Sequence, residues 1–83
     1  MTNTELTFGQ KLTGVDFNPS KNPKVDRLKE LFAEAADIVH EEWLADHEAK
    51  SNTVNLLYQH TIGEILNAQI NAVKFVVTDF DKF

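Results

Sequence analysis

Cysteine is absent from this chain of 83 residues, which excludes disulfides and thiolate metal sites. Long hydrophobic runs are absent too, since no apolar stretch reaches the roughly 18 residues that a membrane-spanning helix needs. Residues 1–5 are polar and lack the basic and apolar regions of a signal peptide. We therefore expect a soluble intracellular protein with no membrane partner.

A chain of this length leaves little room for a hydrophobic core. A domain of about 80 residues buries only about 60–65% of the surface that its unfolded chain exposes. Small domains usually gain further stability from disulfides, metals or contacts between subunits. Because cysteine is absent, unusually good helix packing or oligomerisation remains as the source of the additional stability. We expect one domain over residues 1–83, assembled into a homo-oligomer.

The charges are unevenly placed along the chain. The formal net charge of -5 argues against binding of long nucleic acids over the whole surface. Positions 30–50 carry seven acids and one base, whereas positions 11–29 carry two acids and five of the eight basic residues. Those five are Lys11, Lys21, Lys24, Arg27 and Lys29. This asymmetry allows a local anion site on a protein that is acidic elsewhere.

Hydrophobic periodicity predicts an all-α fold with a long antiparallel helical hairpin. Asn22 followed by Pro23 is typical of a helix start, and apolar residues then recur at steps of three and four. We expect the first long helix over 23–47. Residues 50–53 form a polar break with the next N-cap, and a second long helix follows over 52–77. Residues 1–22 form an N-terminal segment with one short helical turn near 7–12.

The second helix carries more apolar surface than one partner helix can cover. From Thr61 to Val77 two apolar stripes lie on different faces, which predicts subunit contacts. A strand over 75–78 is the alternative for its last turn. Gly63 costs about 1 kcal/mol in a helix relative to alanine, and we interpret it as a point of close approach to a neighbouring helix. Trp43 and Tyr58 are expected to close the turn end of the hairpin.

Three histidines, His40, His47 and His60, raise the question of metal binding or acid–base catalysis. His40 and His47 are seven residues apart and share a helix face, but no third ligand is specified. Residues 40–44 read His-Glu-Glu-Trp-Leu and so lack the second histidine of the His-Glu-x-x-His motif. No nucleophile elbow, phosphate loop or dinucleotide fingerprint is present. We therefore expect no metal, no cofactor and no enzymatic activity.

Residues 14–20, Gly-Val-Asp-Phe-Asn-Pro-Ser, combine turn formers with an aromatic ring ahead of the lysines. In one interpretation they form a plain turn, with Phe17 covering the hairpin and the lysines serving solubility. In the other they form a site for a flat anionic ligand. Phe17 or Phe8 would stack on a purine, Asn18 and Ser20 would bond its polar edges, and the helix start near Pro23 would suit phosphate.

Four segments resemble the phage anti-CBASS cyclic-oligonucleotide sponge family, whose helical hairpin domain is shared with Thoeris anti-defence sponges. They are residues 6–11 (Leu-Thr-Phe-Gly-Gln-Lys), 14–20, 23–25 (Pro-Lys-Val) and 68–74 (Ala-Gln-Ile-Asn-Ala-Val-Lys). The similarity covers about residues 6–77. It implies a helical homo-hexamer in the cytoplasm of an infected bacterium, which binds cyclic dinucleotides such as cyclic GMP-AMP between protomers without cleaving them.

The resemblance also implies roles for individual residues. An N-terminal aromatic contacts the base, matched by Phe17 or Phe8, and a helix-start lysine contacts phosphate, matched by Lys24 or Lys29. Some relatives have a tyrosine in this loop, where this chain has only phenylalanine. The expected ligand-binding set is Phe8, Lys11, Phe17, Asn18, Pro19, Ser20, Lys24 and Lys29.

A second site for cyclic trinucleotides is known in some relatives, which use an arginine on the last helix. Here Asn71 stands near that place and Lys74 follows one turn later, so trinucleotide binding is left open. Lys74 either snorkels to the surface or points its ammonium at a ligand enclosed by several subunits.

Two other functions are compatible with the same residues. The main rival is a non-catalytic oligomeric module that docks on a host or phage protein through the loop. A phosphodiesterase that degrades the messenger is the third, and it has little support because no metal constellation is evident in the sequence.

Overall fold

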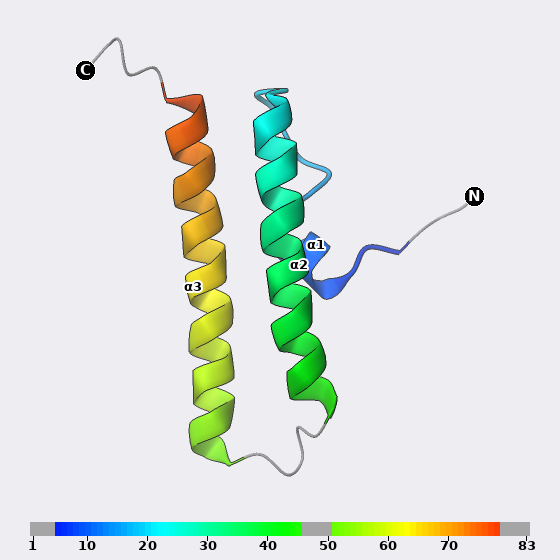
Figure 1. The fold of residues 1–83 in the computed structure, drawn as a ribbon, viewed down its shortest axis with the longest axis vertical. Coiled ribbons are helices and arrows are strands. Elements are labelled where there is room, and N and C mark those ends of the chain that lie inside the picture. The colour runs from blue at the N-terminus through cyan, green and yellow to red at the C-terminus, as the bar shows by residue number, and fades with distance from the viewer. Residues whose placement is uncertain (1–4, 46–50, 79–83) are drawn as a thin grey trace.

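A computed structural model of the chain describes residues 5–45 and 51–78. These residues form α1 (Phe8–Thr13), α2 (Pro23–Ala45) and α3 (Asn52–Val77), with no strand among them. The helices α2 and α3 lie antiparallel and side by side, and the short α1 packs against α2 (Figure 1). The expected all-α fold with a long helical pair is therefore present. Positions 46–47 of the first predicted helix, including His47, lie outside the described residues.

Both long helices begin at the predicted caps. The Asn22 side chain accepts a hydrogen bond from the Lys24 backbone N–H at 2.8 Å, and Pro23 occupies the first helical position, where its missing N–H costs nothing. The Ser51 hydroxyl accepts from the Val54 N–H at 3.2 Å. The last turn of α3 is helical, so the alternative of a strand over 75–78 is wrong for residues 75–77.

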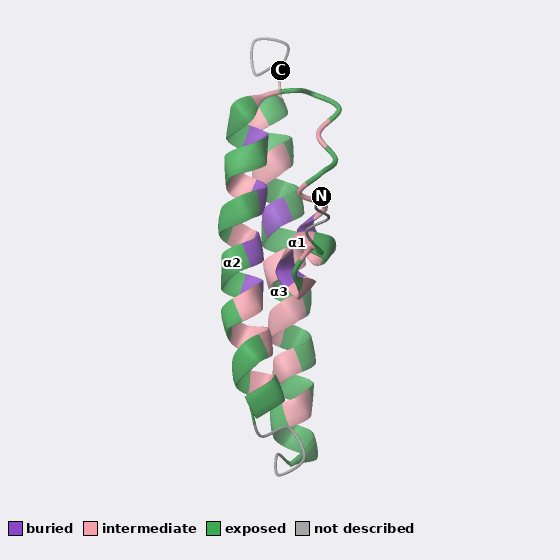
Figure 2. Cartoon of the chain, turned by 90° about the vertical axis from the view of Figure 1, so that its right-hand side faces the viewer, coloured by how far each residue is buried: buried purple, intermediate pink, exposed green. Residues whose placement is uncertain are grey.

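One row of α3 side chains faces the rest of the protein. Steps of three and four residues along α3 place Tyr58, Ile62, Ile65, Gln69 and Ala72 on this row, and all five are buried or half-buried. Figure 2 shows the buried residues on the sides of the long helices that lie near each other and near α1, while the outward sides are exposed. At the turn end, Trp43 stacks on Tyr58 with ring centroids 4.6 Å apart. This closes the hairpin as predicted.

The short helix α1 packs so closely against α2 that no side chain fits between their backbones at Gly9. Gly9 is buried, and a Cβ at this position would lie 2.0 Å from the Ala33 carbonyl oxygen. The Gly9 N–H donates to the Asp37 carboxylate at 2.6 Å. Gly9 is therefore the glycine that permits close helix packing. The prediction placed this role at Gly63, where no other part of the described chain comes within 4 Å of an added Cβ.

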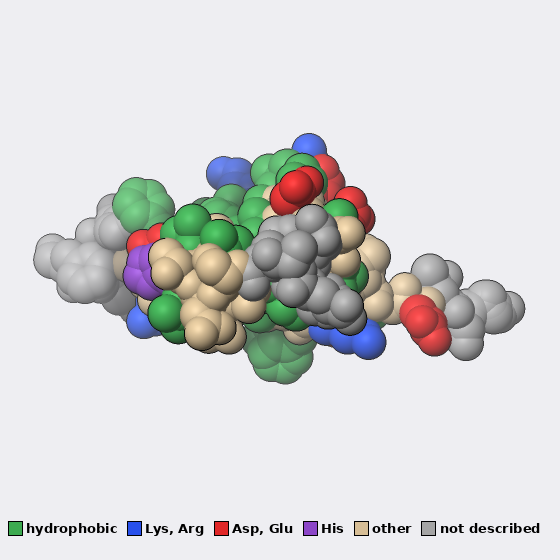
Figure 3. Space-filling model, turned by 90° about the horizontal axis from the view of Figure 1, so that it is seen from below, with side chains coloured by type: hydrophobic (Ala, Val, Ile, Leu, Met, Phe, Trp, Pro, Cys, Tyr) green, Lys and Arg blue, Asp and Glu red, His purple; other side chains and the backbone are tan. Residues whose placement is uncertain are grey.

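The core of the described chain is thin. Its buried hydrophobic residues are Val25, Ala33 and Ala36, whereas ten large hydrophobic residues are exposed. Figure 3, a view onto the turn end of the hairpin, shows hydrophobic side chains at the surface beside the turn. So much exposed apolar surface on a small chain is typical of a protein that associates. Within the described ranges, no helix is long and apolar enough to cross a membrane.

Candidate functional site

The loop between α1 and α2, residues 14–22, begins with a left-handed residue. Gly14 has φ +68° and caps α1, and its N–H donates to the Gln10 carbonyl at 3.0 Å. This conformation favours glycine because a Cβ is disfavoured there. The chain therefore turns sharply at the end of α1 and runs toward the start of α2.

Asn18 holds the middle of the loop in one shape. Its amide nitrogen donates to the Asn22 carbonyl at 2.9 Å and to the Asp26 carboxylate at 3.0 Å. Its amide oxygen accepts from the Ser20 hydroxyl at 2.6 Å and from the Lys21 N–H at 3.1 Å. These polar atoms are therefore bonded within the chain, and the predicted contacts of Asn18 and Ser20 with a base edge would require them to rearrange.

Lys29 of α2 holds the first part of the loop, residues 14–17, through backbone carbonyl groups. Its side chain belongs to α2 and is buried, with 7% of the residue exposed. Its ammonium donates to the Gly14 carbonyl at 3.0 Å and to the Phe17 carbonyl. The same ammonium lies 5.4 Å from the centre of the Phe17 ring, within the range of a cation–π contact. Of the two lysines expected to meet phosphate, Lys29 points inward and Lys24 is exposed.

The loop and the helix ends beside it expose one aromatic ring and several charged side chains. Phe17 is 66% exposed, although its backbone is fixed by Lys29. Asp16, Pro19 and Lys21 of the loop are also exposed. Lys24 is exposed in the first turn of α2, and Lys11 in the last turn of α1. A flat, negatively charged ligand could stack on the ring and meet the ammonium groups.

Phe8, the other aromatic considered for stacking, is used inside the fold. Its ring stacks on the His40 ring with centroids 4.0 Å apart and planes 11° apart. The His40 Nδ1 is hydrogen-bonded to the Tyr58 hydroxyl at 2.7 Å, and burial raises the pKa of Tyr58. One face of Phe8 is thus covered, and Phe17 is the better placed of the two rings to receive a ligand.

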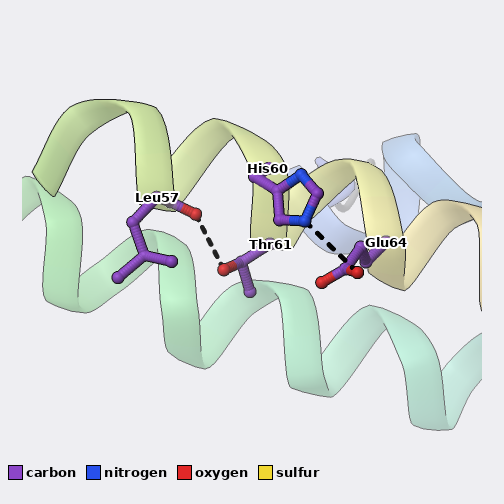
Figure 4. Close-up of polar contacts among 4 residues, drawn as sticks. All are labelled: Leu57, His60, Thr61 and Glu64. Atoms are coloured by element: carbon purple, nitrogen blue, oxygen red, sulfur yellow. Dashed lines mark hydrogen bonds and ion pairs between the residues drawn. The ribbon is translucent and has the colours of Figure 1, made fainter. Parts of the chain in front are cut away.

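The remaining histidine in the described chain lies on the surface of α3. His60 contacts Glu64 one turn later, with 3.3 Å between Nε2 and the carboxylate, and the neighbouring Thr61 hydroxyl donates to the Leu57 carbonyl at 2.8 Å (Figure 4). Both are contacts within one helix. No group of three or more His, Cys, Asp or Glu side chains is arranged for a metal ion in the parts of the chain that are described.

The second predicted site, Asn71 with Lys74, is exposed on α3. Lys74 lies in the last turn of this helix. The C-terminal end of α3 lies beside the N-terminal end of α2 (Figure 1), so this site and the loop are at the same end of the hairpin. Cations from both sites therefore contribute to one end of the molecule.

An apolar groove lies nearer the turn end of the hairpin, where sequence reasoning placed only core residues. Its volume is about 450 Å³ and Glu42 is the one ionisable carboxyl group that lines it. Most of its wall comes from Ile38, Val39 and Trp43 of α2 and from Val54, Leu57 and Tyr58 of α3. Apolar residues that recur at steps of three and four reveal such helix faces in a sequence. Whether another helix covers them depends on the tertiary structure.

The loop carries groups that can bind a flat anionic ligand. The exposed groups in and beside it include the Phe17 ring and lysine ammonium groups, which can stack on bases and pair with phosphates, together with the Asp16 carboxylate. The Asp26 carboxylate, in the first turn of α2, accepts a hydrogen bond from Asn18 at 3.0 Å and thereby supports the loop. Comparison of the chain with protein-family models, curated proteins and solved structures gave no match.

Proposed function

We propose that this protein is a phage sponge for cyclic oligonucleotides, acting in the cytoplasm of the infected bacterium. It binds cyclic dinucleotides such as cyclic GMP-AMP and holds them, uncleaved, away from the effectors of CBASS defence. The proposal rests on the resemblance of residues 6–25 and 68–74 to this family. The structural observation that supports it is the exposed Phe17 ring on a loop braced by Lys29 and Asn18.

The exposed ring and the lysines each have a role in this mechanism. The Phe17 ring stacks on a base, which is worth about 1–3 kcal/mol. Lys24, in the first turn of α2, neutralises a phosphodiester, assisted by Lys21 near the end of the loop. Asn18 and Lys29 bind no ligand atom themselves. They keep the loop folded before the ligand arrives, and this lowers the ordering cost of binding.

The proposed pocket lies between protomers of a homo-oligomer, with a hexamer as the expected assembly. A cyclic dinucleotide carries two phosphodiesters, so symmetry-related lysines from two protomers match its charge. The thin core and the ten exposed large hydrophobic residues favour association. Asn71 and Lys74 form the candidate second site, which would accept a cyclic trinucleotide.

Calorimetric titration with a panel of cyclic dinucleotides and trinucleotides tests this function. We expect saturable binding of at least one ligand, weakened about tenfold or more by Phe17→Ala and by Lys24→Ala. Arg27→Ala is the matched control, because Arg27 is exposed one turn beyond Lys24 and pairs with Glu30 at 3.7 Å. Binding that is unchanged in both loop variants would show that the site is elsewhere.

The apolar groove supports a second candidate, a non-catalytic protein-interaction module. This alternative predicts no heat and no thermal stabilisation with any cyclic nucleotide. Cleavage is tested separately by denaturing the complex after long incubation and analysing the released ligand by chromatography. Intact ligand is expected from a sponge, whereas linear products would indicate a phosphodiesterase.

A further inference from the structure

One row of α2 side chains is largely exposed in the described chain. The row is Lys24, Leu28, Leu31, Ala35, Ile38 and Glu42, named here the α2 stripe. Its steps of four, three, four, three and four residues place all six on one side of the helix. Leu28 is half-buried and the other five are exposed, with Ile38 exposed by 69%.

The α2 stripe lies away from the contact with α1. Ala33 is buried at the point where Gly9 of α1 approaches it. At about 100° per residue, Ala35 and Ile38 lie roughly 140–200° around the helix from Ala33. The side of α2 that α1 covers is therefore not the side that carries the stripe.

The positions of the α2 stripe are symmetric about its midpoint, and its two ends carry opposite charges. Lys24 and Glu42 each lie nine residues from Ala33, on opposite sides of it. Leu28 and Ile38 lie five residues away in the same manner, and Leu31 and Ala35 lie two away. When two copies of this row are placed against each other in antiparallel orientation, each apolar residue faces an apolar residue and each charge faces its opposite.

We propose that the α2 stripe binds the α2 stripe of a second copy of this chain in antiparallel orientation. In this contact Leu28 packs against Ile38 of the second copy and Leu31 packs against its Ala35. Lys24 at one end faces Glu42 of the second copy, and the same pair recurs at the other end. A contact of this kind is isologous, because both copies contribute the same patch.

The surface of α3 beside the stripe extends the contact. Ile38 lines the apolar groove together with Val54 and Leu57 of α3, so the groove adjoins the stripe. Leu57 and Phe75 are 63% and 66% exposed and stand 18 residues apart, about five helical turns, on one side of α3. The second copy would therefore cover apolar side chains of both long helices.

Charge complementarity favours a second copy over a different protein. A parallel arrangement would place Lys24 against Lys24 and Glu42 against Glu42, which is unfavourable at both ends. In the antiparallel arrangement Lys24 of each copy faces Glu42 of the other, so the charges at both ends are paired by residues of this chain. The contact needs no ligand and does not depend on the proposed function. Lys24 has three N–H donors, so Glu42 of the second copy and a phosphate oxygen can share it.

Engineered cysteines test the orientation directly, because the natural chain contains none. Leu28→Cys and tagged Ile38→Cys protomers are purified separately, mixed under reducing conditions and then oxidised. The antiparallel contact predicts a mixed disulfide between the two variants and little disulfide within either one alone. Leu56→Cys is the control, since Leu56 is 65% exposed on α3 but does not line the groove. Disulfides formed mainly between identical variants would overturn the antiparallel arrangement.

Charge reversal separates this contact from ligand binding. By sedimentation, Ile38→Glu is expected to reduce the oligomer to smaller species at micromolar protein, whereas Leu56→Glu does not. Lys24→Glu and Glu42→Lys each weaken the contact, and the double variant restores it because the charges are exchanged. Cyclic dinucleotide binding is not restored in the double variant if Lys24 holds phosphate. A wild-type chain that sediments as a monomer at all concentrations refutes both the contact and a pocket between protomers. An oligomer that persists in Ile38→Glu and still binds the ligand refutes the contact alone.

Discussion

Replacement of Lys29 by methionine tests whether this lysine braces the loop or binds the ligand. Methionine keeps the length and most of the apolar stem of the side chain but removes the ammonium. The Gly14 and Phe17 carbonyls then lose their donor, and the Phe17 ring loses the cation 5.4 Å from its centre. Arg27→Met is the matched control, because Arg27 is exposed and its replacement removes an equal charge from the same helix.

The size of the effect follows from the contacts that are lost. Each hydrogen bond from a charged donor is worth about 1.5–3 kcal/mol, and the cation–π contact adds about 0.5–1 kcal/mol. Part of this is recovered, since the ammonium no longer has to be desolvated and water can reach the freed carbonyls. We expect a net loss of about 2–3 kcal/mol for Lys29→Met, and a change within about 0.5 kcal/mol for Arg27→Met.

Two measurements check this expectation. Urea unfolding at one fixed protomer concentration gives the loss of stability, which corresponds to a fall of roughly 10–20 °C in Tm for a domain of this size. Hydrogen exchange of the amides in residues 14–22 shows whether the loop opens. If Lys29→Met unfolds like Arg27→Met and its loop amides stay protected, Lys29 does not brace the loop. A loss of ligand binding without a loss of stability would instead return Lys29 to the role of phosphate contact.

The remaining predictions concern two glycines and one tyrosine. Gly9→Ala places a methyl group 2.0 Å from the Ala33 carbonyl oxygen, so we expect a loss of at least about 2 kcal/mol in urea unfolding together with faster exchange in α1. Gly63→Ala adds the same methyl group where nothing lies within 4 Å and should stabilise the helix by about 0.5–1 kcal/mol; destabilisation would mean that another chain packs there. Because burial raises the pKa of Tyr58 above its ordinary value, the folded state holds the phenol proton more tightly than the unfolded state. The unfolding free energy of the wild type should therefore fall relative to that of Tyr58→Phe as pH rises above about 10, and parallel pH curves for the two proteins would contradict this.

The long helices are predictable from the sequence because their signals are local. Asn22 before Pro23 and Ser51 before α3 satisfy backbone N–H groups within one turn of themselves, so the residue types suffice to locate the helix starts. The stacking of Trp43 on Tyr58 also follows from their places at the ends of two periodic segments. These features depend on spacing along the chain and little on the rest of the fold.

The roles of the loop residues depend on tertiary contacts that spacing does not reveal. Lys29 is one of five basic residues over 11–29, and only the return of the loop over α2 brings two carbonyls to its ammonium. The sequence allows Phe8 to stack on a ligand, but in the structure its ring stacks on His40. Gly9 and Gly63 are alike in the sequence, but only Gly9 meets a backbone from another helix.

The most direct test of the proposed function is the titration of wild-type protein with cyclic GMP-AMP, followed by recovery of the ligand. A sponge predicts saturable heat, loss of binding in Phe17→Ala with the helical content unchanged, and release of intact cyclic GMP-AMP on denaturation. The absence of heat with every cyclic dinucleotide and trinucleotide tested, from folded wild-type protein, would contradict the proposal.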